Sequence, residues 1–355
     1  MLRIENPERV ERLIGAAVSR LDLDLSGISV LTEGASGNFV VTPLIAALAG
    51  SPHVVALSAD SRYGRASDVA EYIMEWAIRL GVADRIEVTT DRTRARDAGC
   101  SLITNLGFVR PIDAKLVERS PADTVVALMW EPWEFRPGDV DLKFCRGRGI
   151  PVLGTCETDI RVGTFRYVGL IVLKLLFESA LEVDGSDILV VGASPFLQPT
   201  IDVLRRNGAN VTVVAMDDTW PEEVVSRRPI GEYDAIALVD HRSRKNIVGP
   251  DGLLVPEQMI GTGVRLVHVC GVVDDDALAA AGIQKVPPRK VSAGYMTLTT
   301  DYVGPRPVID LHAAGLKVGE IVVRSFRRGS TYSEAVAAAL KSGLALDFDL
   351  RSRGG

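Results

Sequence analysis

The chain has 355 residues, of which 47% are hydrophobic and 24% charged, with a formal net charge of −6. This length supports two domains, each with its own core. The mildly acidic balance lacks the basic surface that nucleic acids and anionic membranes attract, so neither is a predicted partner. Four cysteines at unrelated spacings form no CxxC pair. They predict reduced thiols in a cytoplasmic protein, and no metal site.

The first half of the chain alternates short apolar runs with helical patterns. After an amphipathic N-terminal helix over residues 1–18, this alternation predicts a mostly parallel sheet covered on both faces by helices. The most apolar stretch, 168–176, is too short to span a bilayer. The predicted strands are 28–31, 54–57, 86–89, 101–104, 124–129 and 150–153.

The second half repeats the alternation after a predicted bridging helix over 164–181. Near residue 301 the pattern changes, and helices over 317–327 and 332–343 are predicted to return to the first domain. We therefore predict an α/β protein with two Rossmann-like domains, whose mostly parallel sheets flank an interdomain cleft. The predicted domains are 1–163 plus 305–355 for the substrate, and 164–304 of the nucleotide-binding type. The further predicted strands are 188–191, 211–215, 235–239, 264–269 and 283–286.

Residues 186–218 have the strand, turn, helix and strand of a dinucleotide-binding βαβ unit. In such units, phosphates bind at the helix N-terminus and a carboxylate after the second strand binds ribose hydroxyls. Where the GxGxxG fingerprint has three glycines, this chain has Gly192, Ser194 and Leu197. The alternative is a structural turn that binds nothing. The predicted cofactor-binding residues are Gly192, Ser194, Pro195, Phe196, Asp217 and Asp218.

Polar and aromatic residues follow the predicted strands of the first domain, where open α/β sheets bind their ligands. Residues 33–39 also form a competing anion loop, with 60–62 after the next strand, although a tight turn explains its glycines equally well. The tryptophans after strand 124–129 line a pocket or pack against a partner, and Cys156 is a nucleophile or a small buried side chain. The predicted substrate-binding residues are Gly34, Ser36, Asn38, Asn105, Trp130, Glu131, Glu134 and Cys156.

Three segments, in the right order, resemble the D-isomer-specific 2-hydroxyacid dehydrogenases and their formate dehydrogenase-like relatives. "GDVDLKFCRGRGIPVLGT" is similar to the family's approach to its crossover helix, and "VHVCGVVDDDAL" is similar to its strand followed by RGGxVDExAL. "VIDLHAAGLKVGE" resembles the PHxAG segment that holds the family's catalytic histidine. The resemblance covers roughly residues 137–325 and implies an enzyme that uses NAD or NADP.

The resemblance implies that His312 is the general acid or base and that Asp301 is its acidic partner. A carboxylate that accepts a hydrogen bond from an imidazole sets its tautomer and raises its pKa. The family's catalytic arginine falls on Val269 or Cys270, so the bidentate clamp on a carboxylate is absent. His241 and His268 lie at the ends of predicted strands in the second domain. For both, a structural role is the alternative to a catalytic one.

The leading prediction is therefore an NAD(P)-dependent oxidoreductase that acts on an unknown small molecule, as a homodimer. The changed glycines and the absent arginine favour an alternative, a lyase, hydrolase or isomerase of a specialised biosynthetic pathway on the same scaffold. It would use Glu131, Glu134 or Cys156. A third possibility is a catalytically silent binding protein whose tryptophans form a partner interface.

Overall fold

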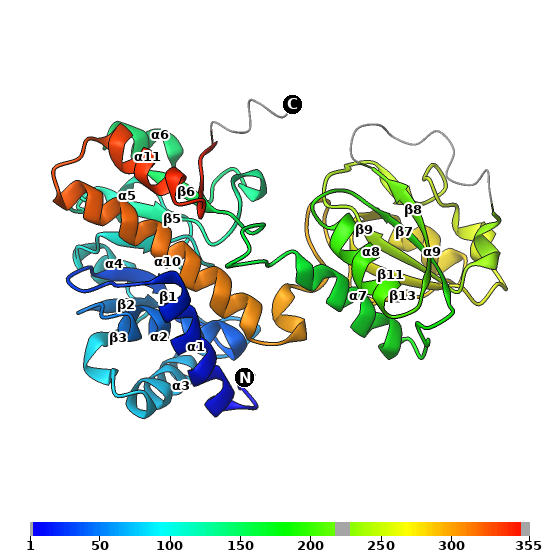
Figure 1. Ribbon diagram of the computed structural model, residues 1–355, viewed down its shortest axis with the longest axis horizontal. Helices are drawn as coiled ribbons and strands as arrows, with labels where there is room; N and C mark the ends of the chain where they lie inside the picture. The colour runs from blue at the N-terminus through cyan, green and yellow to red at the C-terminus, as the bar shows by residue number, and fades with distance from the viewer. Residues whose placement is uncertain (1–2, 217–227, 349–355) are drawn as a thin grey trace. The chain divides into compact units, whose positions relative to one another are not determined.

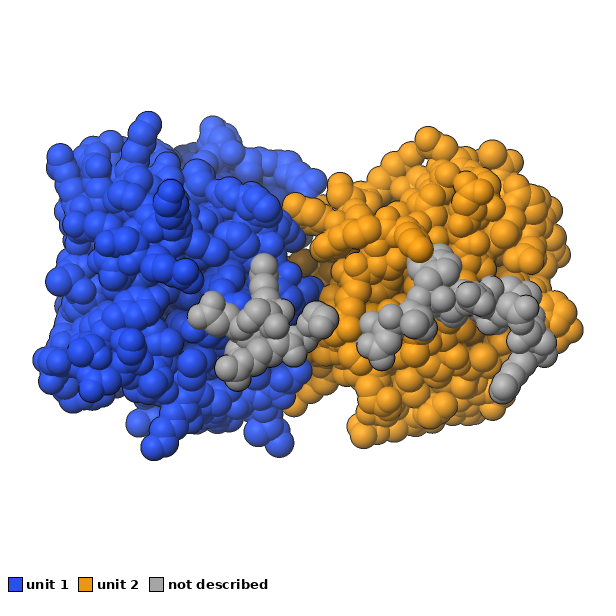
Figure 2. All heavy atoms as spheres, turned by 90° about the horizontal axis from the view of Figure 1, so that it is seen from above, with its two compact units in different colours: residues 1–163, 305–355 blue, residues 164–304 orange. Residues whose placement is uncertain are grey.

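The computed structural model describes residues 3–216 and 228–348, and it divides the chain into two compact units. Unit 1 comprises residues 1–163 and 305–355, and unit 2 comprises residues 164–304 (Figure 2). These boundaries coincide with the predicted domain boundaries. Among the described residues, no helix combines the length and apolar character that crossing a membrane requires.

Unit 1 is built on a seven-stranded sheet in the order β14-β6-β5-β4-β1-β2-β3 (Figure 1). All its strand pairs are parallel except that of β14 with β6. The central strands are buried on both faces, which explains their continuous apolar sequences. The strands are β1 (Val30–Glu33), β2 (Val54–Leu57), β3 (Ile86–Thr89), β4 (Leu102–Thr104), β5 (Val125–Ala127), β6 (Val152–Thr155) and β14 (Ala345–Leu346).

Helices cover both faces of this sheet. One face packs against α1, α2, α3, α10 and α11, and the other against α4, α5 and α6. The helices are α1 (Pro7–Leu21), α2 (Val41–Leu48), α3 (Ala66–Arg79), α4 (Arg92–Asp97), α5 (Ala114–Val117), α6 (Leu142–Gly147), α10 (Arg306–Arg327) and α11 (Tyr332–Lys341). Short 3₁₀ turns are η1 (Gly37–Val40), η2 (Ala83–Arg85) and η3 (Pro132–Glu134).

Helix α10 lies directly on the sheet of unit 1, and two glycines allow the close approach (Figure 1). A Cβ on Gly319 would lie 2.5 Å from Leu102 Cδ1, at the start of β4. A Cβ on Gly315 would lie 2.2 Å from Met129 Sδ, beyond the end of β5. The N-terminal part of α10 therefore extends toward the carboxyl ends of the strands. The helix predicted over 317–327 was too short, because the segment from Arg306, with Pro307 in its first turn, is already helical.

Unit 2 contains a parallel five-stranded sheet in the order β13-β11-β9-β7-β8. The predicted buried strand 211–215 is β8, but it is an edge strand with a largely exposed sequence. The strands are β7 (Asp187–Gly192), β8 (Asn210–Ala215), β9 (Ala235–Val239), β11 (Arg265–Cys270) and β13 (Lys285–Val286), with a separate pair β10 (Asn246–Val248) and β12 (Val272–Val273). The helices and turns are α7 (Arg166–Glu178), α8 (Leu197–Arg206), α9 (Asp275–Ala280), η4 (Ile230–Glu232), η5 (Pro256–Met259) and η6 (Thr300–Val303).

The predicted fold class is confirmed, since both units are α/β layers with mostly parallel sheets. In unit 1, β1 has β2 on one side and β4 on the other. Strand β3 lies beyond β2, and strands β5 and β6 lie beyond β4. The order of the strands thus reverses between β1 and β4. Ligands of open α/β sheets bind outside the carboxyl ends of the strands at such a switch point.

Candidate functional site

Glu33 is the last residue of β1 and stands at the switch point of unit 1. Its side chain is buried, and its Oε2 atom accepts a hydrogen bond from the backbone N–H of Phe108 at 3.4 Å. Burial raises the pKa of Glu33 to about 7, although the amides of Phe108 and Gly107 and the charge of Arg110 lower it. A carboxyl with this pKa exchanges its proton near neutral pH. Glu33 begins the predicted anion loop 33–39, but it was not among the residues predicted to bind the substrate.

Asn105 directly follows β4, the neighbour of β1 in the sheet. The register that pairs Leu31 with Ile103, extended past the end of β4, brings Asn105 level with Glu33. Asn105 is fully buried, and its Oδ1 atom accepts a hydrogen bond from Met129 N at 2.7 Å. Because a backbone N–H only donates, this contact identifies the acceptor atom of the carboxamide. The amide nitrogen Nδ2 is buried and has no hydrogen-bond partner.

Trp130 follows β5 and stacks with arginines. The guanidinium carbon of Arg110 lies 5.1 Å from the centre of the Trp130 ring, and that of Arg136 lies 5.9 Å from it. Arg110 also pairs with Asp139 at 2.9 Å. The indole Nε1 of Trp130 and the Nε of Arg110 are both buried and have no hydrogen-bond partner. The predicted site residues Asn105 and Trp130 therefore both carry buried N–H groups without a hydrogen-bond partner.

Glu131 and Glu134 have different surroundings. Both carboxylate oxygens of Glu131 accept hydrogen bonds, from Glu157 N at 2.9 Å and from Trp133 Nε1 at 2.8 Å, and these bonds hold the loop together. Glu134 is hydrogen-bonded to the side chain of Glu157, and burial raises its pKa to about 7. Two carboxyl groups form such a bond only when they share a proton. The loop after β5 thus retains a proton near neutral pH.

The remaining predicted substrate-binding residues lie at the same edge of the sheet. Gly34 follows β1, where a Cβ would lie 3.1 Å from Ile73 Cδ1, so packing against α3 accounts for this glycine. Ser36 precedes η1, and Asn38 lies within it. Cys156 follows β6, and its Sγ atom lies 3.3 Å from Thr158 Oγ1. Their role in substrate binding remains a prediction.

His312 lies near the N-terminal end of α10. Its side chain is buried, its Nδ1 atom lies 2.6 Å from Thr42 Oγ1 in α2, and its ring centre lies 6.0 Å from that of Phe39. Burial lowers its pKa to about 3, so the imidazole is neutral. Because His312 precedes Gly315 by one turn, it lies toward the carboxyl ends of the strands. Asp301 belongs to η6 of unit 2, where Thr299 donates to its carboxylate, and its pairing with His312 remains a prediction.

The loop from Gly192 to Leu197 connects β7 to α8 in unit 2. A Cβ on Gly192 would lie 2.4 Å from Val239 Cγ2, so the close approach of β9 requires this glycine. The N–H groups of Phe196 and Leu197 both donate to Ala193 O. Pro195 has no N–H, and neither does Pro199. The start of α8 therefore offers a phosphate few amide donors.

Aromatic packing fixes the same loop of unit 2. The Phe196 ring centre lies 4.6 Å from that of His241 and 5.3 Å from that of Phe165. Ser194 is exposed on the loop. Asp217 and Asp218, the predicted ribose ligands, lie outside the described residues. His268, the second histidine predicted at a strand end, is buried. Its Nε2 atom lies 2.9 Å from Gly271 O, and its Nδ1 atom lies 3.2 Å from Lys285 Nζ.

Within residues 3–216 and 228–348, no cluster of three or more His, Cys, Asp or Glu side chains is arranged to hold a metal ion.

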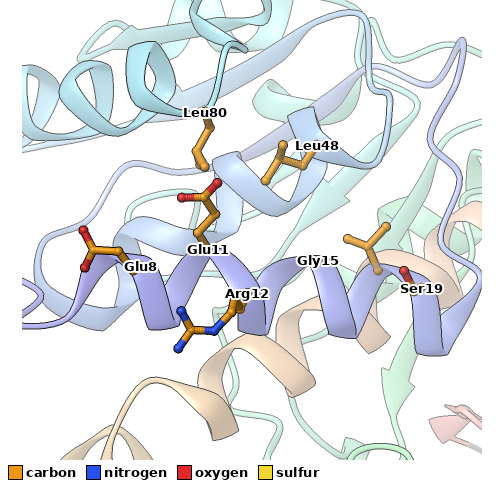
Figure 3. Close-up of a pocket in the computed structure, with 8 residues that line it drawn as sticks. Glu8, Glu11, Arg12, Gly15, Ser19, Leu48 and Leu80 are labelled. Atoms are coloured by element: carbon orange, nitrogen blue, oxygen red, sulfur yellow. The ribbon is translucent and has the colours of Figure 1, made fainter.

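A groove lies apart from the residues described above. It is open, has a volume of about 670 Å³, runs beside α1 and includes Gly15, Leu48 and Leu80 (Figure 3). Leu48 ends α2, which precedes β2, and Leu80 directly follows α3, which precedes β3, so the groove lies toward the amino ends of the strands, opposite the switch point.

Known proteins resemble this chain in structure. No family model matches the sequence, and no curated protein matches it. A dipicolinate synthase chain from Bacillus subtilis matches with a TM-score of 0.54 and 11% identity, over 86% of this chain and 99% of that one. The corresponding dipicolinate synthase chain from Bacillus halodurans matches with a TM-score of 0.51 and 10% identity, over 82% of this chain and 96% of that one.

At such identities the two likenesses establish a common fold. A weaker match is the NAD-dependent formate dehydrogenase from Staphylococcus aureus, solved in complex with NAD, with a TM-score of 0.40 and 11% identity over 85% of this chain and 97% of that one. The likeness to the two dipicolinate synthase chains shows the predicted Rossmann-like fold, and the predicted resemblance to the D-isomer-specific 2-hydroxyacid dehydrogenase and formate dehydrogenase-like superfamily is confirmed in that respect alone.

Proposed function

We propose that this protein is an NAD(P)-dependent oxidoreductase that acts on a small molecule. Unit 1 would bind the substrate at the carboxyl ends of β1, β4 and β5, and unit 2 would bind the nucleotide. The observation that carries this proposal is the position of His312, a buried, neutral imidazole toward the edge of the sheet where Asn105 and Trp130 carry unpaired N–H groups. The fold shared with the dipicolinate synthase chains supports it.

His312 would move the proton of the reaction. A bound nicotinamide would exchange a hydride with the substrate carbon. Because Nδ1 of His312 is engaged by Thr42, Nε2 is the atom left to exchange a proton with the substrate oxygen. A neutral imidazole takes a proton from a hydroxyl group and returns it to a carbonyl oxygen in the reverse direction. Asp301 would support the protonated form if it approaches the ring, as the resemblance implies.

The test is a titration of the full chain with NADH and with NADPH, followed by nicotinamide fluorescence and tryptophan quenching. We expect saturable binding at micromolar concentrations of one of them, and loss of this binding in Asp217→Arg, which removes the carboxylate where the sequence predicts the ribose contact. Small carbonyl compounds are then screened as substrates, and oxidation of the bound NADH or NADPH is measured. His312→Gln should then abolish turnover while nucleotide binding persists. Absence of binding of both nucleotides to the folded protein would contradict the proposal.

A second candidate function follows from the loop before α8. Pro195, Pro199 and the two amides that donate to Ala193 leave few donors for a pyrophosphate. This observation favours a non-redox enzyme of a biosynthetic pathway, a lyase, hydrolase or isomerase, whose reaction takes place on unit 1 alone. The same titration separates the two, because a non-redox enzyme would bind its substrate without either nucleotide. A catalytically silent protein would bind a ligand or partner equally well after His312→Gln.

We propose a homodimer as the assembly. Helix α7 exposes Leu170 and Phe177, at 37% and 58% of their surfaces, and Leu173 lies between them on the same side of the helix. Apolar residues that recur at intervals of three and four form a stripe that a second helix covers. Light scattering should give twice the mass of 38.2 kDa, and Phe177→Lys should reduce it toward the single-chain value. A single-chain mass for the unaltered protein would contradict this proposal.

A further inference from the structure

Three N–H groups at the switch point of unit 1 are buried and have no hydrogen-bond partner. They are Asn105 Nδ2, Trp130 Nε1 and Arg110 Nε. All three donate and none accepts. Asn105 is fully buried, so its unpaired amide lacks solvent as well. Leaving such a donor unpaired in the interior is costly, which makes this group of donors a site that a ligand with acceptor atoms would stabilise.

These donors are neighbours of Glu33. The register of β1 with β4, extended past the end of β4, brings Asn105 level with Glu33. Gly107 lies close to the side chains of both Glu33 and Arg110. A Cβ at this position would lie 3.1 Å from Glu33 Oε2 and 3.9 Å from Arg110 Nη2. Arg110 in turn stacks on Trp130. By strand alternation, Glu33, Asn105 and Trp130 belong to the face of the sheet that α4, α5 and α6 cover. We call these four residues, Glu33, Asn105, Arg110 and Trp130, the switch-point cluster.

We propose that the switch-point cluster binds the oxyanion group of a small molecule, with Asn105, Trp130 and Arg110 donating to its oxygens and Glu33 donating in its protonated form. A carboxylate and a phosphate share this acceptor chemistry. The inference rests on the proposed function for its role, since the oxyanion would belong to the substrate that unit 1 holds. Its binding step is independent of any nucleotide.

Glu33 makes this binding depend on pH. The charged groups that bear on it are Arg110, which favours its ionised form, and Asp139, which already pairs with Arg110. An ionised Glu33 beside the ligand would repel it, so Glu33 takes up a proton as the oxyanion binds. With the pKa of Glu33 at about 7, binding should be about tenfold weaker at pH 8 than at pH 6. In Glu33→Gln, which still donates and does not titrate, this difference should disappear.

The indole N–H of Trp130 reports directly on the site. The chain has four tryptophans, and Trp130→Phe assigns the signal of Trp130 in a two-dimensional ¹H–¹⁵N spectrum of the full chain. The probes are pyruvate, which carries a carboxylate, and sulfate, a tetrahedral oxyanion; neither titrates between pH 6 and pH 8. Acetamide is the neutral control. We expect the Trp130 signal to shift saturably with at least one oxyanion and not with acetamide.

Matched variants separate recognition from folding. Asn105→Asp keeps the acceptor for Met129 N but replaces the donor with a negative charge, so the Trp130 shift should be lost. Glu87→Gln removes a carboxylate on β3 that pairs with Arg94, and should leave the shift unchanged. A shift with pyruvate alone assigns a carboxylate to the site, and a shift with sulfate alone assigns a phosphate-like group.

Two results would overturn the inference: a Trp130 signal that neither oxyanion moves at pH 6, or a shift that persists in Asn105→Asp. Circular dichroism of each variant verifies that it is folded. A failure here is distinct from a failure of the proposed function, because the nicotinamide titration is followed by nicotinamide fluorescence and contains neither pyruvate nor sulfate. A protein that binds NADH and gives no Trp130 shift contradicts only oxyanion binding by the switch-point cluster. A protein that gives the Trp130 shift and binds neither NADH nor NADPH contradicts only the proposed nucleotide binding.

Discussion

Thr42 Oγ1 lies 2.6 Å from His312 Nδ1, within the buried contact between α2 and α10. The imidazole of His312 thus has a neutral hydroxyl as its hydrogen-bond partner within unit 1. A hydroxyl both donates and accepts, so it stabilises the neutral ring in either tautomer. It brings no charge to offset burial, and burial alone lowers the pKa of His312 to about 3.

The Thr42–His312 bond should contribute measurably to stability. Thr42→Val keeps the shape of the side chain and leaves Nδ1 without a partner, so we expect a loss of about 1–3 kcal/mol in the free energy of unfolding. Thr42→Ser, which retains the hydroxyl group, should lose less. Urea unfolding measures both variants. Equal stability of Thr42→Val and the unaltered protein would show that the bond is not formed in solution.

His312 should remain neutral at every pH at which the protein is folded. Its folded-state pKa is lowered from 6.5 to about 3, so it contributes stability that is present above pH 6.5 and is lost as the pH falls toward 3. The ¹⁵N shifts of the His312 ring should show no titration between pH 5 and pH 9. Titration of His312 near 6.5 would mean that water reaches the ring.

The proton shared by Glu134 and Glu157 predicts the opposite pH dependence. Burial raises the folded-state pKa of Glu134 from 4.5 to about 7, so the protonated pair stabilises the fold below pH 4.5 and this contribution is lost as the pH rises through 7. Glu134→Gln keeps a hydrogen bond to Glu157 without the proton. It should raise stability at pH 8 by about 1–3 kcal/mol relative to the unaltered protein. Unfolding curves at pH 5 and pH 8 that move in parallel would exclude the shared proton.

The glycines of α10 should tolerate no side chain. Gly319→Ala would place Cβ 2.5 Å from Leu102 Cδ1, and the forced displacement should cost about 1–3 kcal/mol. Gly15→Ala in α1 is the matched control, because nothing beyond the adjoining helix backbone lies within 4 Å of its Cβ position. It should stabilise the protein by up to about 1 kcal/mol, since alanine favours the helix. Thermal unfolding compares the two, and similar melting temperatures would contradict the close packing of α10.

The sequence predicted the strands well because buried parallel strands are continuous apolar runs. It misjudged β8, since Val211 to Ala215 has the same composition although the strand is at an edge. The beginning of α10 was not predicted, because residues 308–312 resemble the family's histidine segment although they have helical spacing. Pro307, at a position typical of helix starts, was the available signal.

The candidate site was predicted in part. Asn105 and Trp130 follow strands, so their position at the carboxyl edge was evident from order along the chain. Glu33 begins the predicted anion loop 33–39, but its proximity to Asn105 depends on the register of β1 with β4, which pairs residues 72 positions apart along the chain. Thr42 was missed for the same reason, since it meets His312 only through the packing of α2 on α10. Alternation along a strand shows which residues share a face, whereas the identity of the neighbouring strand comes from tertiary structure.

The division of unit 1 into residues 1–163 and 305–355 has a consequence for synthesis on the ribosome. Unit 2 is continuous in sequence, so it is complete as soon as residue 304 has left the exit tunnel. The sheet of unit 1 has by then emerged without α10 and β14, and the apolar face that α10 covers is still open to water. The first strands to be translated therefore belong to the unit that matures last, and chaperones have a defined interval in which to protect them.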